Sequence, residues 1–286
     1  AQDAPDKFIQ DLDTQELHQR RRVPVGVLGA TGNVGQKLLM LIDKHRWFQV
    51  TAVAASDKSQ GKKYKDAVQW RMPVKMSETV ANLEVMAPEP NLPCKIIFSC
   101  LDGSVAAEIE QKFAQNGYTV ISCARAHRMD PTVPLFIPEV NVQHLELLKE
   151  QKFPNKGILI AKPNCAVIGL MMALRPLQLE FGIEAINVVT MQSISGAGYP
   201  GVPSLAITDN IIPYIANEED RLEEEPAKIL GTINKGKIEP YPMKISATCT
   251  RVPVTEGHLE VVSVKLKEKA TLEQVKRAFK EDRKSV

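Results

Sequence analysis

Residues 23–42, "VPVGVLGATGNVGQKLLMLI", run from an apolar strand through a glycine turn into an amphipathic helix. The glycines are Gly29, Gly32 and Gly35, so their spacing is GxxGxxG. Glycine permits a tight strand-to-helix turn, lets backbone N–H groups approach a pyrophosphate, and allows the helix to pack closely on the sheet. A glycine-rich turn without a ligand is the alternative. Strand, glycines and helix in this order favour a dinucleotide-binding βαβ unit.

The loop after the next predicted strand, "FQVTAVAAS" (residues 48–56), bears on the choice of cofactor. In NAD-specific proteins an acidic side chain at the end of this strand binds the ribose 2′-hydroxyl. Here hydroxyl and ammonium groups surround a single aspartate, and such groups suit a 2′-phosphate. The loop therefore favours NADP, and a solvated basic loop is the alternative. The side chains concerned are Ser56, Asp57, Ser59, Lys62 and Lys63.

Two further strands are predicted from "CKIIFSC" (94–100) and "YTVISC" (118–123), with a helix between them over residues 104–117. Strands that alternate with helices form an open, mostly parallel sheet with right-handed crossovers, which is a Rossmann-like α/β domain. Cofactors bind at the carboxyl ends of such strands. We therefore expect residues 99–103 and 123–128 to line the cofactor cleft.

The pattern changes after residue 162. "EAINVVTMQSISGAG" (184–198) predicts a long strand that enters a glycine-rich loop, and residues 245–266 predict two strands joined by a short turn. Folding this predicted hairpin about its centre places Arg251 opposite His258. The chain is thus divided into an N-terminal arm (1–22), a dinucleotide-binding domain (23–162) and a sheet-rich α+β domain (163–286).

Composition limits the classes of function. The 286 residues carry a net charge of +2, which gives no electrostatic reason to expect binding to nucleic acid or to a membrane surface. No apolar stretch reaches the length of a membrane span. The five cysteines are irregularly spaced without a CxxC pair, which suits reduced thiols in the cytoplasm better than disulfides or a metal site.

One cysteine stands at a predicted helix start, in "KPNCAVIGL" (162–170). Pro163 resists continuing any preceding helix, Asn164 is a favoured N-cap, and a helix is predicted from Cys165 to Leu174. In the first turn of a helix, unpaired N–H groups and the helix dipole favour a thiolate over a thiol. A reactive cysteine and a small buried residue are the two interpretations.

Together these motifs resemble one family. "GVLGATGNVG", "PEVN", "PNCA", "MQSISGAGYPGVPSL", "KILG" and "RVPVTEGH" occur in the order found in aspartate-semialdehyde dehydrogenases of the archaeal and fungal branch, over residues 23–265. The resemblance implies a glyceraldehyde-3-phosphate dehydrogenase-like architecture whose second domain is catalytic and dimerising. It implies a cytoplasmic homodimer or homotetramer, with an organelle as the alternative compartment.

The implied reaction converts β-aspartyl phosphate, with NADPH, into aspartate 4-semialdehyde and phosphate through a cysteine thioester. It belongs to the biosynthesis of lysine, threonine and methionine. Within the resemblance Cys165 is the nucleophile, His258 the acid/base and Gln192 the residue that orients the acyl group. The substrate contacts are Arg251 for the α-carboxylate, Glu218 for the ammonium, Arg128 and Arg221 for phosphate, and Asn164, for which a plain N-cap is an equal account.

The cofactor residues come from three segments. They belong to the glycine turn, to the loop after the second strand and the end of the third, and to the "SISGAG" loop. These residues are Gly29, Thr31, Gly32, Asn33, Val34, Ser56, Ser59, Lys62, Ser99, Ser195 and Gly196. No metal is expected.

Three departures from the family are visible. Arg221 stands where the family generally has a lysine, and Cys123 stands where it commonly has an asparagine. The family also continues for some tens of residues beyond "KRAFKEDRKSV", including a helix that contacts the nicotinamide side. We therefore expect the 286-residue chain alone to bind the adenosine half of NADP and to be weakly active or inactive, which steady-state kinetics would test.

Other functions remain open from the sequence. Malonyl-coenzyme A reductases resemble the same branch, and a non-catalytic NADP-binding relative is a further alternative. N-acetyl-γ-glutamyl-phosphate reductases share the thiol chemistry, but "RVPVTEGH" fits them less well. A binding module has no need of Cys165, Gln192, Arg251 and His258 together, which argues against the non-catalytic alternative.

Overall fold

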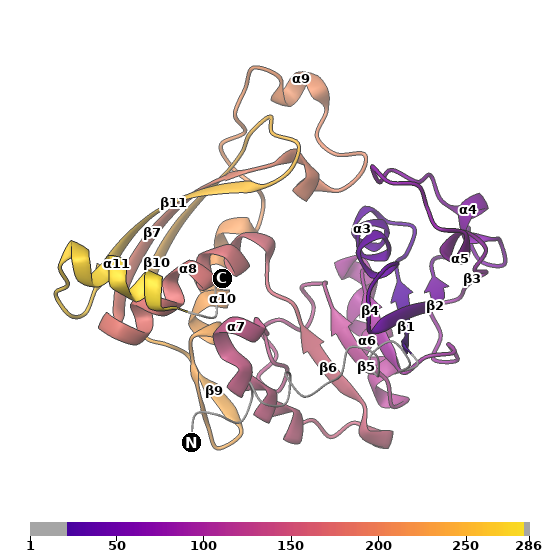
Figure 1. The fold of residues 1–286 in the computed structure, drawn as a ribbon, viewed down its shortest axis with the longest axis horizontal. Helices are drawn as coiled ribbons and strands as arrows, with labels where there is room; N and C mark the ends of the chain where they lie inside the picture. Colours follow the sequence, from indigo (N-terminus) through magenta and orange to yellow (C-terminus); the bar gives the residue numbers. More distant parts are fainter. Residues whose placement is uncertain (1–21, 283–286) are drawn as a thin grey trace.

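The computed structural model describes residues 22–282, so the predicted arm lies outside the described residues except for Arg22. Figure 1 shows two sheets, one at each side of the molecule, with helices between and around them. Within the described range, no helix is long and apolar enough to span a membrane.

The first sheet has six strands, all parallel, in the order β3-β2-β1-β4-β5-β6. This confirms the predicted Rossmann-like sheet and adds two short strands that the sequence interpretation did not name, β3 and β6. From β1 the chain runs outward through β2 to β3, and it then returns to β4 on the other side of β1. The strand order therefore reverses between β1 and β4, and the cofactor cleft is expected at the carboxyl ends of these two strands. The strands are β1 (Val23–Leu28), β2 (Phe48–Ala54), β3 (Val85–Met86), β4 (Ile96–Ser99), β5 (Thr119–Ser122) and β6 (Ile158–Ala161).

Helices cover both faces of this sheet. On one face α3 (Asn33–Ile42) packs on the side chains of Val25 and Val27, and on the other face α6 (Gly103–Gln115) packs over Leu28. Alternate residues of β1 therefore face opposite cores, as the period of a strand requires. The second of these cores continues without interruption into the C-terminal half of the chain.

The turn between β1 and α3 depends on two glycines. Gly29 has a φ of +68°, which a side chain rarely adopts. A Cβ at Gly35 would lie 2.4 Å from the carbonyl oxygen of Gly29 and 2.8 Å from Cα of Ala30. Backbone atoms cannot move aside, so the helix can approach the strand this closely only with glycine at position 35.

Gly35→Ala is expected to lower the free energy of unfolding by about 1–3 kcal/mol, because the new methyl group overpacks the turn. Gly32→Ala is the matched control. Its Cβ would meet only the Gly29 oxygen, at 3.4 Å, and its φ of −73° suits any residue. Urea unfolding of the two variants measures the difference, and equal effects would contradict the steric argument.

The second sheet corrects the predicted hairpin. Its order is β10-β7-β11, so the two strands expected to pair with each other are instead separated by β7. β10 runs parallel to β7 and β11 runs antiparallel to it. The connection after Arg251 bonds across the end of the middle strand, where the Val252 N–H donates to Gln192 O and the Ile194 N–H donates to Val254 O. The strands are β7 (Ile183–Gln192), β10 (Lys244–Arg251) and β11 (His258–Leu266).

Helix α8 (Cys165–Phe181) connects the two sheets. The predicted helix ended at Leu174, but the structure continues it through Pro176 to a Gly182 C-cap. Proline removes one backbone hydrogen bond. Burial of Leu177 and Phe181 in the shared core offsets that loss.

Two longer helices pack in the C-terminal half, and the shorter elements are spread along the chain. α10 (Glu218–Ile229) packs against β10 and α8, and α11 (Leu272–Glu281) packs against α8. The shorter elements are α4 (Tyr64–Ala67), α5 (Glu78–Ala81), α7 (Pro138–Asn141), η1 (Val142–Lys149), η2 (Pro154–Lys156), η3 (Ile194–Ala197), α9 (Ser204–Ile207), β8 (Thr232–Asn234) and β9 (Lys237–Glu239).

Candidate active site

The N-terminus of α8 presents Cys165. Asn164 caps the helix as predicted, since its Oδ1 accepts hydrogen bonds from the N–H groups of Ala166 (2.8 Å) and Val167 (3.4 Å). Its Nδ2 donates to Glu218 Oε1 at 2.8 Å. Both ends of the Asn164 amide are therefore engaged by the protein, which fixes the first turn of the helix and the sulfur that it carries.

His258 lies beside this sulfur. Its Nε2 is 3.3 Å from Cys165 Sγ, although 93 residues separate the two in sequence. The N–H of Ser193 donates to His258 Nδ1 at 3.2 Å. A nitrogen that accepts this bond carries no proton, so the neutral ring has its proton on Nε2, the atom that faces the sulfur.

The pKa of Cys165 is raised above the usual value of a thiol, mainly because protein surrounds the sulfur and secondarily because of the Glu218 carboxylate. Lys162 and the N–H groups of the first helical turn lower the pKa but do not reverse the shift. The expectation that the helix start alone favours a thiolate is therefore wrong. Desolvation outweighs Lys162 and these N–H groups, although part of the Cys165 side chain is exposed to solvent.

The last residues of β7 and β10 and the first residue of β11 meet at the site. Arg251 at the end of β10 and His258 at the start of β11 are both paired with Gln192 at the end of β7. The predicted proximity of Arg251 and His258 thus arises through a middle strand. Arg251 is mostly buried, and its Nη1 donates to Ser193 O at 2.6 Å.

The "SISGAG" loop lies over this strand end. A Cβ at Gly196 would lie 3.2 Å from Arg251 Nη1 and 3.8 Å from His258 Cε1. Ser195 shares a 2.9 Å hydrogen bond with Ser193 through their hydroxyls. Gly196 therefore lies beside His258, and Ser195 is linked to His258 through Ser193.

The Glu218 carboxylate joins several side chains of the site. Its carboxylate accepts hydrogen bonds from Asn164 Nδ2, from Gln192 Nε2 at 3.2 Å and from Arg221 Nη1 at 2.6 Å. Only 4% of Glu218 is exposed. One buried carboxylate thus ties together three side chains that were predicted to contact substrate.

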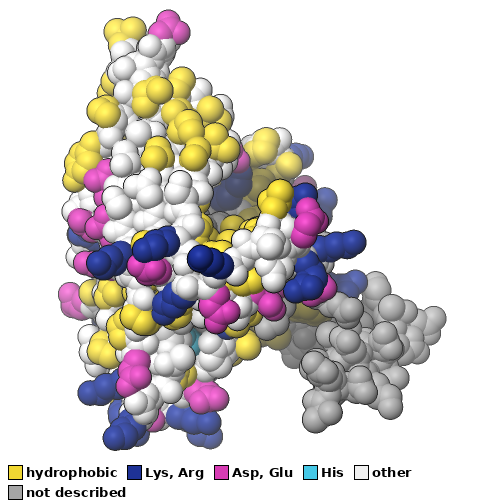
Figure 2. All heavy atoms as spheres, turned by 90° about the vertical axis from the view of Figure 1, so that its left-hand side faces the viewer, with side chains coloured by type: hydrophobic (Ala, Val, Ile, Leu, Met, Phe, Trp, Pro, Cys, Tyr) yellow, Lys and Arg dark blue, Asp and Glu magenta, His cyan; other side chains and the backbone are white. Residues whose placement is uncertain are grey.

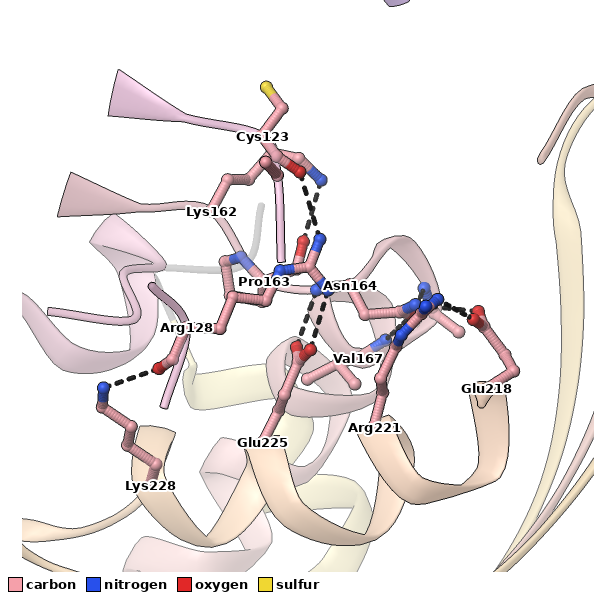
Figure 3. A network of polar contacts seen from close by, with 12 residues as sticks. Cys123, Arg128, Lys162, Pro163, Asn164, Val167, Glu218, Arg221, Glu225 and Lys228 are labelled. Carbon is pink, nitrogen blue, oxygen red and sulfur yellow. Dashed lines mark hydrogen bonds and ion pairs between the residues drawn. The ribbon is translucent and has the colours of Figure 1, made fainter. Parts of the chain in front are cut away.

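Arg128 belongs to the loop after β5 and contacts Glu225, which lies further along α10 than Glu218. Its guanidinium donates from Nη1 to Glu225 Oε1 at 2.7 Å and from Nη2 to Cys123 O at 3.2 Å (Figure 3). Its Nε is buried without a hydrogen-bond partner among the described residues. Arg128 and Arg221 both line a groove of about 260 Å³, together with Arg125 and the carboxylates of Asp220, Glu224 and Glu225.

Cys123, the departure from the family pattern, lies at the end of β5 beside Cys100 at the end of β4. A thiol–thiol hydrogen bond with Cys100 is the main cause that lowers the pKa of Cys123 to about 7, and Lys162 and Arg128 lower it further. The same bond raises the pKa of Cys100 well above its usual value. Cys123 also supplies the carbonyl that holds Arg128.

The predicted cofactor residues of the first domain lie at one edge of the six-stranded sheet. Gly29, Thr31, Gly32, Asn33 and Val34 form the turn after β1. The loop after β2 is tied to β3, because the Gly61 N–H donates to Val85 O and the Val85 N–H donates to Lys62 O. The loop residues are Ser56, Ser59 and Lys62, and the lysine side chain is exposed.

Ser99 is an exception. Its side chain is fully buried, with its hydroxyl beside the buried Glu110. Ile97 and Ser99 point to the face of one core, whereas Ile96 and Phe98 pack against the other, so the Ser99 side chain does not line the cleft and the predicted contact would involve its main chain. Within residues 22–282, no cluster of three or more His, Cys, Asp or Glu side chains is placed to hold a metal ion.

The sequence interpretation did not name Glu225 or Lys228. Both are buried and contact the loop that carries Arg128. The signal was the spacing of Glu218, Arg221, Glu225 and Lys228, which places all four on one face of α10.

Comparisons with known proteins agree with this geometry. Models described as "Semialdehyde dehydrogenase, NAD binding domain" and "Semialdehyde dehydrogenase, dimerisation domain" match residues 24–148 and 174–286. The aspartate-semialdehyde dehydrogenase of Archaeoglobus fulgidus is 47% identical over 262 residues, which cover 90% of this chain and 76% of that protein. The enzyme of Aspergillus fumigatus is 45% identical over 267 residues, covering 90% and 74%.

Solved structures give the same result. The aspartate semialdehyde dehydrogenase of Candida albicans, determined with NADP, superposes with a TM-score of 0.84 at 40% identity, covering 91% of this chain and 76% of that one. The Vibrio cholerae aspartate semialdehyde dehydrogenase II, complexed with ASA, gives 0.72 at 27% identity, covering 92% and 80%. The chain therefore belongs to the aspartate-semialdehyde dehydrogenase family.

Proposed function

We propose that this protein is an NADP-dependent aspartate-semialdehyde dehydrogenase, which converts β-aspartyl phosphate into aspartate 4-semialdehyde and phosphate. The observation that carries the proposal is the 3.3 Å pair of Cys165 and His258, set beside the converging ends of β7, β10 and β11. A thiol next to a histidine at a helix N-terminus is the arrangement that acyl transfer to sulfur requires. Family membership supplies the acyl phosphate as the substrate class.

In the first step Cys165 Sγ attacks the acyl carbon, the carbon–oxygen bond to phosphate breaks, and a thioester forms. The thiol proton ends on the departing phosphate. His258 Nε2 is the titratable nitrogen in contact with the sulfur. To carry this proton, the ring must change tautomer, and the bond from the Ser193 N–H to Nδ1 opposes that change in the resting state.

In the second step the thioester is reduced. NADPH, when bound, supplies the hydride for this reduction. His258 Nε2–H donates to the oxyanion that develops on the acyl group, and the carbon–sulfur bond then breaks to release the aldehyde and a thiolate. A proton from solvent restores the resting thiol.

The remaining side chains bind substrate in this proposal. Arg251 offers its guanidinium to the α-carboxylate, and Gln192 holds the acyl group. Arg128 and Arg221 line the groove that would take the phosphate. Glu218 accepts three hydrogen bonds from the protein, and a carboxylate has about four acceptor sites, which leaves one for the substrate ammonium.

The residues present fit NADP. The N-cap of α3, Gly32, makes no side-chain cap, so the first N–H groups of this helix have no side-chain acceptor at its N-terminus. Such N–H groups bind phosphate oxygens well. Ser56, Ser59 and Lys62 on the neighbouring loop would hold the 2′-phosphate.

The double variant Lys62→Ala, Ser59→Ala is expected to raise the KM for NADP about 10- to 100-fold, because charge-assisted contacts with a 2′-phosphate are lost. The weaker activity with NAD should not change. Lys95→Ala is a matched control, since Lys95 precedes β4 at the opposite edge of the sheet. Equal losses with both cofactors would show that the loop does not contact the 2′-phosphate.

A paired assay tests the proposed reaction. The protein should reduce NADP with aspartate semialdehyde only when phosphate is present. It should not oxidise NADPH with malonyl-coenzyme A. The opposite pattern would make it a malonyl-coenzyme A reductase. Activity in neither assay would agree both with the weak activity expected of these 286 residues alone and with a non-catalytic relative.

The protein is further proposed to act as a homo-oligomer. Residues 174–286 match a dimerisation domain, and Leu259 and Val261 of β11 are exposed hydrophobic side chains. Figure 2 views the molecule from the side of α11 and the three-stranded sheet, and shows hydrophobic side chains gathered in the upper part of that face.

The five cysteines are free, as expected in a reducing compartment such as the cytoplasm.

A further inference from the structure

One face of α10 points at the two loops that build the active site. Glu218, Arg221, Glu225 and Lys228 follow one another along this face, and Figure 3 shows all four directed toward the loops after β5 and β6. Two of them pair with arginines, as Glu218–Arg221 and Glu225–Arg128. The second pair lies deeper, with only 2% of Glu225 exposed.

Each oxygen of the Glu225 carboxylate holds a different loop. Oε1 accepts from Arg128 Nη1 at 2.7 Å, and Oε2 accepts from the main-chain N–H of Asn164, also at 2.7 Å. Arg128 belongs to the loop after β5. Asn164 belongs to the loop after β6 and immediately precedes Cys165.

We propose that Glu225 is a positioning residue that fixes Arg128 relative to the nucleophile Cys165. This inference rests on the proposed function, in which Arg128 binds the phosphate of the acyl phosphate. The phosphate and the attacked carbon belong to one small substrate, so the arginine and the sulfur must be held at a set separation. A single carboxylate that bonds to both loops sets this separation directly.

Lys228 supports the same arrangement one turn further along. Its Nζ donates to the carbonyl oxygens of Arg128 (2.6 Å), Asp130 (2.6 Å) and Val133 (2.8 Å). The main chain of the arginine loop is therefore bound by Lys228, while the guanidinium is bound by Glu225. Because Lys228 binds the main chain independently of Glu225, a change at Glu225 can release the Arg128 guanidinium without unfolding the loop.

The charge of Glu225 and its length have separable effects. A glutamine at this position offers one oxygen and one NH₂ group, so a donor must face either Arg128 or the Asn164 N–H, and one bond is lost. An aspartate keeps the charge but is shorter by one methylene group. Because the Arg128 side chain is flexible and the Asn164 N–H is not, aspartate is expected to keep the first bond and lose the second.

The experiment compares Glu225→Gln, Glu225→Asp and the control Glu223→Gln. Glu223 is exposed on the same helix, and its oxygen accepts from the Ala247 N–H, which glutamine can still satisfy. In the oxidative direction, Glu225→Gln should raise the KM for phosphate at least about tenfold, with the KM for NADP unchanged. Glu225→Asp should keep a KM for phosphate near that of the unchanged protein but lower kcat.

A second measurement does not depend on turnover. The rate of Cys165 alkylation by iodoacetamide, and the protection that inorganic phosphate gives against it, are measured below the melting temperature of each variant. Glu225→Gln should alter the alkylation rate and lose the protection, Glu225→Asp should alter the rate but keep the protection, and Glu223→Gln should change neither.

The outcomes distinguish the two proposals. A folded Glu225→Gln protein with unchanged phosphate KM, alkylation rate and protection overturns the positioning role. So does a uniform loss of every parameter in proportion to a lowered melting temperature, which is the mark of a purely structural residue. If the unchanged protein shows no phosphate-dependent activity, turnover does not support the proposed function, and alkylation still decides whether Glu225 positions Cys165. If Glu225→Gln does not fold, Glu225→Asp decides. A lowered kcat with an unchanged KM for phosphate supports the positioning role, and proportional losses of both overturn it.

Discussion

Cys165→Ser is expected to abolish turnover, with a loss of kcat of about 10³-fold or more, and to leave NADP affinity unchanged. A serine hydroxyl in the same position is a much weaker nucleophile than a thiol, and its deprotonation is harder. The cofactor contacts proposed for the turn after β1 and the loop after β2 do not involve position 165. Steady-state kinetics and NADP titration of the variant measure the two quantities.

Two of the other thiols, those of Cys94 and Cys249, provide the controls. Cys94 is buried, with a pKa raised to about 11 by desolvation, and Cys249 is buried with a pKa also raised to about 11. Iodoacetamide should therefore label Cys165 before either of them, and Cys94→Ala should keep full activity. Preferential labelling of Cys94 or Cys249, together with activity in Cys165→Ser, would contradict the assignment of the nucleophile.

The pH dependence of labelling follows from the raised pKa of Cys165. A raised pKa means that the thiolate appears only at a pH above the range usual for a thiol. In the absence of substrate, the alkylation rate should therefore rise with pH and reach half its maximum above that range. A half-maximum below it would show that the helix N-terminus outweighs desolvation, as the sequence suggested.

The first half of the fold was predictable because its signals are local. β1, the glycine turn and α3 form one continuous stretch in which hydrophobic runs, glycines and helical periodicity each mark an element. Parallel sheets are buried on both faces, so β4 and β5 also appear as short apolar runs. The right-handed crossover rule then limits the possible arrangements of these strands, but their order in the sheet was not predicted. β3 was missed because a strand of two residues leaves little pattern. β6 is as long as β4 and β5, and its apolar run "ILIA" was simply not named as a strand.

The second sheet was not predictable in the same way. A strand, a short turn and a strand are most simply folded as a hairpin, and the sequence contains no sign that β7 inserts between β10 and β11. That pairing joins residues about 60 to 80 positions apart, such as Thr250 with Met191 and Val264 with Ile186. Tertiary packing on α8 and α10 decides it.

The site residues, too, fall into those with a signal in the local sequence and those without one. Cys165, Gln192, Arg251 and His258 were predictable because each lies in a motif that the family resemblance marks. Glu225 and Lys228 were missed because an acidic helix is usually a solvated one, and burial of its inner face depends on where α10 packs. The pKa of Cys165 was mispredicted for the same reason. The cap is visible in the sequence, whereas the desolvation comes from chain segments distant in sequence.

His258→Gln and His258→Ala are expected to lower kcat by about 10²- to 10⁴-fold, because a proton can no longer be exchanged at the nitrogen beside the sulfur. The two substitutions should not be equivalent. The Ser193 N–H donates to Nδ1, which assigns the proton of the neutral ring to Nε2. The glutamine amide places a donor near the same point, so it preserves the hydrogen bond to the sulfur and to the developing oxyanion, whereas alanine removes it.

Glutamine should therefore retain about tenfold more activity than alanine. This factor is the effect on the rate of one hydrogen bond to a charged group. His45→Gln is the control, because His45 lies in the turn after α3, where its Nδ1 accepts from the N–H groups of Trp47 and Phe48. Single-turnover kinetics separate thioester formation from reduction. If glutamine and alanine slow both steps equally, His258 acts only through proton transfer, and the ring must leave the tautomer that Ser193 favours. If neither variant loses activity, a group other than His258 handles the proton, and the 3.3 Å contact with Cys165 has no part in the chemistry.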